Sequence, residues 1–315
     1  MVEYRKLISF GKSSYVISLP KAWVLKNKLE KGSLIAVTET TENLLLSPKL
    51  DLDKRESKKI IINVDNKDFR RIKREIIAAY INNNQTIILT GKELKNKSAD
   101  LRGILHNIMA LEIMEQTSDR VVAKDFLNMK KLQFSSLIRK MDVMLRSMLS
   151  DTKICFKEDV YDHIRQREAD VDRLAFLIYR MVKFSLMNPS EVRDLHVTPN
   201  DLLNYWWMAN NLEKATDKIK HLAKHITDIK VGPKIQSQLV EFLTILEGNL
   251  SMTMKAYYSN NKELAFKAAN EKEPLIKGCV AFVEKNWKIQ YLPELLEHIK
   301  ETAIAIHNIG RTVYS

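Results

Sequence analysis

From about Leu127 to the C-terminus, apolar residues recur at the spacing of an α-helix, and this feature constrains the fold more than any other. Proline and asparagine interrupt the pattern where helices stop or start, because proline offers no backbone donor. The interruptions leave six segments, near 127–149, 157–187, 199–227, 234–258, 261–287 and 293–312. Six helices of this length predict two successive three-helix bundles, over 127–231 and 232–315, in a mainly α chain.

The first fifty residues follow a different pattern, in which short apolar strands alternate with turn residues. Two hairpins are predicted, the first from residues 7–10 and 15–19 and the second from residues 34–38 and 43–47. We expect residues 1–50 to form a separate domain. A charged linker at 51–59 is expected to join it to the rest of the chain.

The intervening segment, 58–125, alternates strands with helices. The strands are expected at 59–64, 86–89, 112–114 and 120–123, and the helices at 67–81 and 98–109. Alternation at this spacing predicts a small α/β subdomain. The segment carries no motif that indicates a particular chemistry, so we expect it to serve either as a spacer or as a sensor of a small ligand.

The chain is strongly basic, with 51 lysine and arginine residues, 39 aspartate and glutamate residues and a formal net charge of +12. This surplus favours a polyanionic partner, either nucleic acid or an anionic membrane surface. Part of the surplus lies in residues 1–31, which hold seven basic and two acidic residues. Basic side chains and small hydroxyl donors suited to phosphate contact occur there at Arg5, Lys6, Lys12, Ser13, Ser14 and Lys21. A merely solvated basic face is the alternative interpretation.

The order of residues in this region carries a family resemblance. Its segments are Arg5-Lys6-Leu7, Tyr15-Val16-Ile17-Ser18-Leu19-Pro20-Lys21-Ala22-Trp23 and Leu29-Glu30-Lys31-Gly32-Ser33-Leu34. Together they resemble the AbrB/MazE swapped-hairpin family of transcription regulators. The resemblance implies a prokaryotic protein of the archaeal type. The resemblance implies that the hairpins of two chains interlock into one β-barrel, so each chain of a homodimer supplies half. It also implies DNA contact by Arg5, Lys6, Lys12 and Lys21. Lys31 and Ser33 depart from the family, where proline and aspartate are common.

Two pairs of acidic residues lie on predicted helices at four-residue spacing, Glu168 with Asp172 and Glu213 with Asp217. Residues spaced in this way share a helical face, where like charges repel by some tenths of a kcal/mol. A bound cation or a nearby basic side chain offsets that repulsion. The pairs therefore predict either a site for a hard cation such as Mg²⁺, Mn²⁺, Ca²⁺ or iron, or a solvated acidic face paired with lysine and arginine.

On these acidic motifs and the helices that carry them, residues 127–315 resemble PhoU, the phosphate-uptake regulator. That family has two three-helix bundles that carry an (E/D)xxxD motif on two helices each and bind metal clusters. The resemblance implies a metal site for iron, Mg²⁺, Mn²⁺ or Zn²⁺ at Glu168, Asp172, Glu213 and Asp217. It also implies a phosphate-transport or signalling protein as a partner. The second bundle departs from the motif at Glu271, Glu273, Glu297 and Glu301, which argues against a second cluster.

Two histidines continue the column of Glu213 and Asp217 in steps of four, His221 and His225. Each step of four turns about 40° around the helix, so His225 lies about 120° from Glu213 and is excluded from a compact site with it. Surface histidine is the preferred interpretation, with His221 a marginal ligand.

The remaining features limit the class of protein. Cys155 and Cys279 are the only cysteines and lack a metal-binding spacing, which fits a reducing cytoplasm. We find no secretory signal and no run of about 18 uncharged apolar residues. No nucleophile is paired with a base. We therefore predict a cytoplasmic, non-enzymatic regulator of phosphate homeostasis that binds DNA. An adaptor that binds no DNA and restrains a phosphate transporter or its signalling partner is the alternative.

Overall fold

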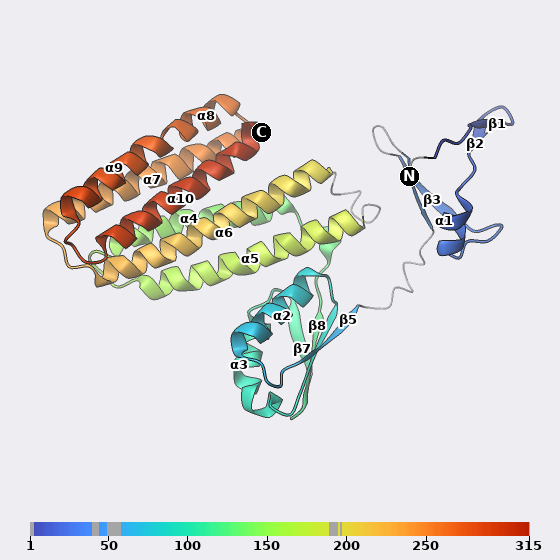
Figure 1. The fold of residues 1–315 in the computed structure, drawn as a ribbon, viewed down its shortest axis with the longest axis horizontal. Helices are drawn as coiled ribbons and strands as arrows, with labels where there is room; N and C mark the ends of the chain where they lie inside the picture. Colours follow the sequence, from blue (N-terminus) through green and yellow to red (C-terminus); the bar gives the residue numbers. More distant parts are fainter. Residues whose placement is uncertain (1–2, 40–43, 49–57, 189–194, 196, 315) are drawn as a thin grey trace. The chain divides into compact units, whose positions relative to one another are not determined.

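A computed structural model of the chain describes residues 3–39, 44–48, 58–188, 195 and 197–314 (Figure 1). The chain divides into two compact units, residues 1–57 and 58–315. Residues 51–57 of the expected linker lie outside the described residues. The larger unit contains the α/β segment and the long helices, so the chain is mainly helical, as its sequence predicts.

The first unit contains two β-hairpins and a short helix. Its elements are β1 (Ile8–Phe10), β2 (Ser14–Val16), α1 (Lys21–Lys26), β3 (Ile35–Glu39) and β4 (Leu44–Pro48). β1 pairs antiparallel with β2, and β3 pairs antiparallel with β4. Gly11 turns the first hairpin with a φ of 70°, which glycine adopts without strain. The two predicted hairpins are confirmed. The described residues close no barrel, so the swapped-hairpin barrel stays a prediction.

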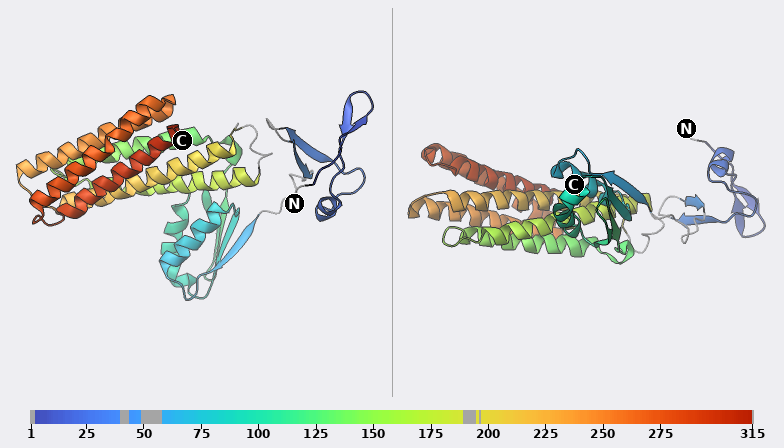
Figure 2. Two further views of the ribbon diagram at one scale, coloured as in Figure 1. Left: turned by 45° about the horizontal axis from the view of Figure 1, so that its top comes forward. Right: turned by 90° about the horizontal axis from the view of Figure 1, so that it is seen from below.

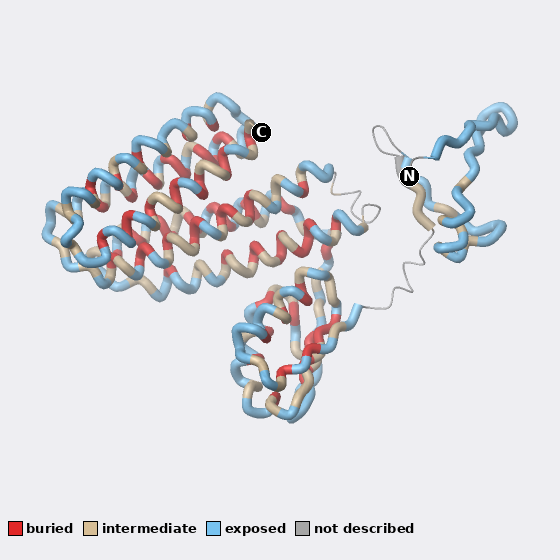
Figure 3. The backbone as a smooth tube through the Cα atoms, in the orientation of Figure 1, coloured by how far each residue is buried: buried red, intermediate tan, exposed pale blue. Residues whose placement is uncertain are grey.

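No described side chain of the first unit is buried, and Figure 3 shows its backbone as exposed or intermediate throughout. Large apolar and aromatic side chains are among the exposed ones. Tyr4 is 95% exposed, Phe10 71% and Tyr15 69%. Small domains depend on burying such side chains for their stability. The described residues of this unit therefore provide no hydrophobic core within one chain.

Residues 58–125 form a four-stranded sheet with two helices. The strands are β5 (Lys59–Asn63), β6 (Thr86–Thr90), β7 (Leu111–Gln116) and β8 (Arg120–Asp125), and the helices are α2 (Phe69–Ile81) and α3 (Leu94–His106). The strand order is β5-β6-β8-β7, with β5 parallel to β6 and the other pairs antiparallel. The crossover helix α2 permits the parallel pair. The predicted alternation of strands and helices is confirmed, although α3 begins earlier than residue 98, and the subdomain boundaries stay a prediction.

One face of this sheet forms a hydrophobic core with the two helices. Ile62, Ile87 and Leu89 of the strands are buried together with Ile72 of α2 and Leu101 of α3. Side chains alternate between the faces of a strand, and Ile61 is accordingly 68% exposed. Helices α2 and α3 therefore lie side by side and cover one face of the sheet.

Seven α-helices follow among the described residues, and they run lengthwise alongside one another (Figure 2). They are α4 (Phe134–Ile154), α5 (Tyr161–Met187), α6 (Pro199–Asp228), α7 (Pro233–Ser259), α8 (Lys262–Asn270), α9 (Lys272–Asn286) and α10 (Leu292–Tyr314). None of the helices in the described part of the chain combines the length and the apolar run that crossing a membrane requires.

Two of the expected helices were wrong in extent. The helix expected at 261–287 is two helices, because Pro274 has no backbone N–H to bond the carbonyl of Asn270, where α8 ends. The helix expected from residue 127 begins at Phe134, after a short 3₁₀ turn at Met129–Lys131. The remaining helices lie close to the predicted bounds.

One hydrophobic core runs through the helices from α4 to α10. Met141 of α4, Ile219 of α6 and Ile306 of α10 are all fully buried in it. The indole Nε1 of Trp207 on α6 also donates to the backbone carbonyl of Asn308 on α10 at 2.9 Å. The helices of the two expected bundles thus share a core, and the division at residue 231 stays a prediction.

A buried arginine joins the α/β subdomain to the helices. Arg180 of α5 is 2% exposed and forms an ion pair with Asp125 of β8, which is 5% exposed. Its Nε donates to Oδ1 of Asn83 at 3.0 Å, and its guanidinium lies 4.4 Å from the ring centroid of Tyr80. Buried charges require such partners, so Arg180 fixes α5 against α2 and β8.

Candidate functional site

The two predicted acidic pairs lie on neighbouring helices and face each other. Val171 of α5 and Leu212 and Ala215 of α6 are buried in the core, which turns the adjacent acidic positions toward a shared surface. Helix α6 begins at a capping box, in which Thr198 and Asp201 satisfy each other's backbone N–H groups. The structure therefore brings together all four predicted residues: Glu168, Asp172, Glu213 and Asp217.

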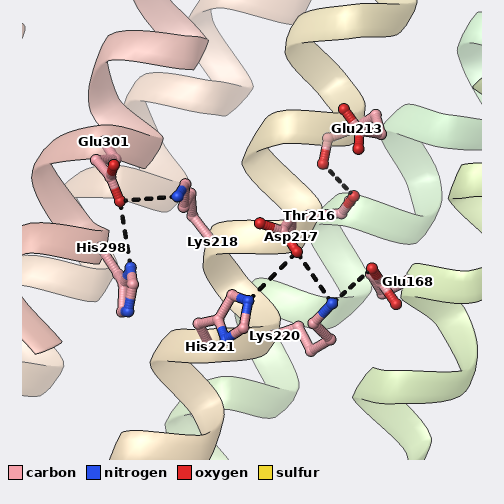
Figure 4. A network of polar contacts seen from close by, with 9 residues as sticks. All are labelled: Glu168, Glu213, Thr216, Asp217, Lys218, Lys220, His221, His298 and Glu301. Atoms are coloured by element: carbon pink, nitrogen blue, oxygen red, sulfur yellow. Dashed lines mark hydrogen bonds and ion pairs between the residues drawn. The ribbon is translucent and has the colours of Figure 1, made fainter. Parts of the chain in front are cut away.

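A lysine bridges the two helices in the middle of this acidic cluster (Figure 4). Nζ of Lys220 lies 2.7 Å from Oε1 of Glu168 and 3.0 Å from Oδ1 of Asp217. Burial opposes the charge on Lys220, but these hydrogen bonds outweigh it and raise the pKa of the ammonium. Lys220 thus neutralises one carboxylate from each helix.

Asp172 and Glu213 have no such lysine partner within the residues that the structure describes. Burial raises the pKa of Asp172 to about 7, and the charges of Glu168 and Glu213 add to the effect. Burial likewise raises the pKa of Glu213, with Asp217 and Glu168 contributing. Oδ1 of Asp172 is buried and has no hydrogen-bond partner among the described residues. In both carboxyl groups burial is the main cause, and the neighbouring negative charges add to it.

The carboxylate oxygens of the cluster are suitable ligands for a hard cation, but their positions in the structure do not form a coordination site. Carboxylate oxygens are the ligands that Mg²⁺ and Mn²⁺ prefer, and the unpartnered oxygen of Asp172 is available to one. Within the described ranges, however, no three histidine, cysteine, aspartate or glutamate side chains are arranged to hold a metal ion. For Glu168 and Asp217, pairing with lysine is the arrangement observed. Metal ligation stays a prediction.

A stack of imidazoles continues from the cluster toward α10. The ring of His298 lies 5.6 Å from that of His221 and 5.4 Å from that of His225. Nε2 of His221 is 3.5 Å from Asp217 Oδ1, and Nδ1 of His298 is 3.3 Å from Glu301 Oε2. Burial lowers the pKa of His298 despite that carboxylate. His221 is exposed, as predicted, whereas His225 is partly buried.

The acidic residues of the second bundle pair with basic residues instead of gathering together. Glu301 lies 3.2 Å from Lys218 of α6, and Glu273 lies 3.2 Å from Lys272. Glu297 forms an ion pair with Lys300 one turn away. The absence of a second cluster, expected from the motif, stays a prediction.

The predicted DNA-contacting residues lie around the first hairpin. All six are exposed: Arg5, Lys6, Lys12, Ser13, Ser14 and Lys21. Lys12 lies in the turn between β1 and β2, and Ser14 opens β2. Arg5 forms an ion pair with Glu3. The hairpin turn therefore presents a cation and two hydroxyl groups to solvent, and DNA contact stays a prediction.

Sequence reasoning missed two residues of the cluster. Lys220 lies three residues after Asp217, a spacing that is visible in the sequence, but its bond to Glu168 depends on how α5 and α6 pack. His298 comes from α10 and follows no metal-binding spacing. Contacts between helices that are distant in the sequence have no local signal.

Comparison with known protein families gives a match to one family model over part of the chain. Residues 138–226 match the model of the PhoU domain. The match begins within α4, covers α5 and ends within α6, so it includes all four carboxylates of the cluster. No curated protein and no solved structure matches the chain. The expected resemblance to PhoU is confirmed over these residues, and the AbrB-type resemblance of the first unit stays a prediction.

Proposed function

We propose that this chain is a PhoU-type regulator of phosphate homeostasis that also binds DNA. The observation that carries the proposal is the PhoU match at residues 138–226, which contains the acidic cluster. Proteins of that family regulate phosphate uptake, so the helices are proposed to interact with a phosphate-transport or signalling protein.

DNA binding is proposed for the first hairpin. Lys12, Ser13 and Ser14 are exposed around its turn, where lysine and small hydroxyl groups suit contact with phosphate oxygens. Lys6 and Lys21 add exposed positive charge, whereas the charge of Arg5 is balanced by Glu3. A compact basic turn of this kind favours a polyanion, and DNA is the polyanion that the AbrB-type resemblance implies.

A homodimer is proposed because the first unit has no core of its own among its described residues. Exposed apolar side chains on both hairpins, such as Phe10 and Val37, need burial to hold the unit together. A second copy of the chain supplies matching hairpins, and the AbrB-type resemblance implies interlocking of this kind. Sedimentation equilibrium of the intact chain tests this step, since a monomer at micromolar concentration contradicts it.

A bound metal ion is proposed for the acidic cluster. Glu168, Asp172, Glu213 and Asp217 supply hard oxygen ligands, and a divalent or trivalent cation would relieve the repulsion that raises the pKa of Asp172. Iron, Mg²⁺, Mn²⁺ and Zn²⁺ are the ions considered. The ammonium of Lys220 competes for Glu168 and Asp217, so it must move away when the ion binds.

We also propose that the chain is not an enzyme and acts in the cytoplasm. Burial raises the pKa of Cys155 to about 11 and that of Cys279 to about 12, which keeps both thiols protonated and poor nucleophiles. Two buried free cysteines also suit a reducing compartment.

An electrophoretic shift assay tests DNA binding. The probe is the region upstream of phosphate-transport genes, and the proteins are the intact chain, Lys12→Glu and a chain lacking residues 1–50. We expect the intact chain to bind and both variants to lose most of that binding. Equal binding by all three would remove the DNA proposal.

The alternative is an adaptor that binds no DNA and restrains a phosphate transporter or its signalling partner. The observation that favours it is that the PhoU match begins in α4 and ends in α6 and includes no residue of the first unit. In that case the hairpins serve dimerisation only. Absence of DNA binding by the intact chain, together with dimer formation that is lost when residues 1–50 are removed, supports this alternative.

A further inference from the structure

A cleft lies between the α/β subdomain and the helices; DNA binding does not account for it, and the proposed metal site shares only Asp172 with its lining. Helices α2, α3 and α5 line a cavity of about 510 Å³. Cavities of a few hundred Å³ at the junction of two structural layers commonly hold small ligands. The Arg180 ion pair fixes α5 against the subdomain, so the walls of this cleft are held in place by a buried contact.

The walls of the cleft are largely apolar and come from three elements. Phe69 and Ile77 of α2, Ile104 of α3 and Phe176 of α5 face it. Phe69 remains 39% exposed although it is a large aromatic side chain. Aromatic and aliphatic side chains on opposite walls suit a flat apolar body, which gains contact area on both faces.

The charges around the cleft favour an anion. Its lining contains Arg70, Lys73 and Arg173 against Asp100 and Asp172, and in the described part of the chain Arg173 is already paired with Asp170. Arg70 and Lys73 are three residues apart on α2, so they share a helical face, and both are exposed. Neither has an ion-pair partner in the described part of the chain. An arginine and a lysine so placed suit a carboxylate or a phosphate.

The α5 wall also carries polar atoms without partners. Nε of Arg173 and Oδ1 of Asp172 are buried and make no hydrogen bond within the described residues. Buried polar atoms are nearly always paired in folded proteins. An anionic ligand in the cleft offers an acceptor to Nε of Arg173, whereas Asp172 belongs to the acidic cluster that is proposed to bind a cation.

We propose that this cleft binds a small organic anion that has a flat apolar body. Arg70 and Lys73 bind the anionic group, and the body packs between Phe69, Ile104 and Phe176. Mononucleotides and aromatic carboxylates share this chemistry. The proposal goes beyond the regulation of phosphate uptake, because it gives the α/β subdomain a ligand of its own and stands whether or not the first unit binds DNA.

Isothermal titration calorimetry of the full-length chain tests the proposal with three probes: adenosine monophosphate, 2-naphthoate and inorganic phosphate. We expect the nucleotide or the naphthoate to bind at least tenfold more tightly than phosphate, and the tighter of the two identifies the source of the ligand. The proposal would be overturned if neither organic probe binds, or if inorganic phosphate binds as tightly as the better organic probe.

The location of binding is tested with charge-reversed variants of exposed residues on one helix. Arg70→Glu/Lys73→Glu is expected to weaken the organic probe tenfold or more. The matched control, Arg74→Glu, lies on the same helix outside the cleft lining and should leave the affinity within twofold. Equal affinity in the double variant and the wild type contradicts the proposal. Unchanged thermal unfolding shows that each variant is folded.

A further variant separates this proposal from DNA binding. Lys12→Glu is expected to bind the organic probe with unchanged affinity, because it lies in the first unit. Loss of probe binding in Lys12→Glu together with retention in Arg70→Glu/Lys73→Glu would assign the anion to the hairpin and end the proposal for the cleft.

Discussion

Asp172 is a carboxylic acid whose surroundings oppose its charge. Its usual pKa is 3.8 and its folded value is about 7, mainly because of burial and then because Glu168 and Glu213 are close. Between these two values the folded chain retains a proton that the unfolded chain has lost. Stability therefore falls as pH rises across this range and stays reduced above it.

Replacing this carboxylate with its neutral isostere tests the effect of its charge. In the presence of a metal chelator, Asp172→Asn is expected to be more stable than the wild type at pH 8 by on the order of 2 kcal/mol, and nearly equal at pH 4. Urea unfolding at the two pH values measures the difference. Asp162→Asn, an exposed position on the same helix, serves as the control. A variant that is less stable at pH 8 contradicts the expected penalty.

Lys220 is expected to compete with a metal ion for the same carboxylates. Lys220→Met removes two charge-assisted hydrogen bonds. In the presence of a metal chelator, it should lower the free energy of unfolding by roughly 1–3 kcal/mol. It should also raise the affinity for Mn²⁺ or Mg²⁺, because Glu168 and Asp217 become free. Thermal unfolding across a metal titration measures both effects. A variant that gains no more stability from metal than the wild type argues against ligation there, and Lys224→Met is the control on the same helix.

The acidic cluster was predicted from sequence only as far as helical periodicity allows. The four-residue spacing of Glu168 and Asp172 fixes them on one face whatever the tertiary structure. The contact of Lys220 with Glu168 and the stacking of His298 on His225 depend on how separate helices pack. A single sequence therefore predicts that the carboxylates share a helical face. It does not predict that Lys220 and His298 lie beside them, because those contacts form between helices.

Among the elements, α5 connects most features of the larger unit. Glu168 and Asp172 on it belong to the acidic cluster, Phe176 lines the cleft, and Arg180 holds the α/β subdomain. These residues recur every four positions, so each lies about 40° further around the helix axis than the one before it. A displacement of α5 would consequently alter the cluster and the cleft together.

The Arg180 ion pair is expected to be essential to this arrangement. Arg180→Met leaves Asp125 buried without its partner and should destabilise the chain by about 3–5 kcal/mol. Arg180→Met/Asp125→Asn should recover part of that loss, because the orphan charge is gone while the side chain can still accept from the Leu127 N–H. Chemical unfolding measures both.

The exposed pair of Arg165 and Asp162 on the same helix provides the control for that prediction. Arg165→Met should change stability by less than about 1 kcal/mol, because both partners are solvated. Similar losses for Arg180→Met and Arg165→Met would show that burial of the ion pair does not matter.

The elements themselves were largely predictable, and the exceptions have local causes. Pro274 was visible in the sequence, and its missing N–H explains why the helix expected at 261–287 divides at Glu271. Arg180 gave no signal, because a single arginine in an amphipathic helix usually lies at the surface. Its partners on α2 and β8 are known only from the fold.

In the whole molecule, two units differ in how they are stabilised. The larger unit buries a continuous core from α4 to α10 and a second one beneath its sheet. The described part of the smaller unit buries nothing within one chain and exposes both apolar and basic side chains. We therefore propose that the smaller unit completes its core with a second chain and uses its basic turn to bind DNA.

If the positive charge of the first hairpin binds DNA, the affinity must depend steeply on salt concentration, because binding releases counterions. Fluorescence anisotropy of a duplex from upstream of phosphate-transport genes is measured between about 50 and 200 mM salt. If a dimer contacts six or more phosphates, affinity should fall by about 10³-fold or more. Lys12→Glu should bind more weakly with a shallower slope, whereas Lys262→Glu, the same charge change in the larger unit, should match the wild type. Absence of binding, or equal affinity and slope in Lys12→Glu, would contradict the claim.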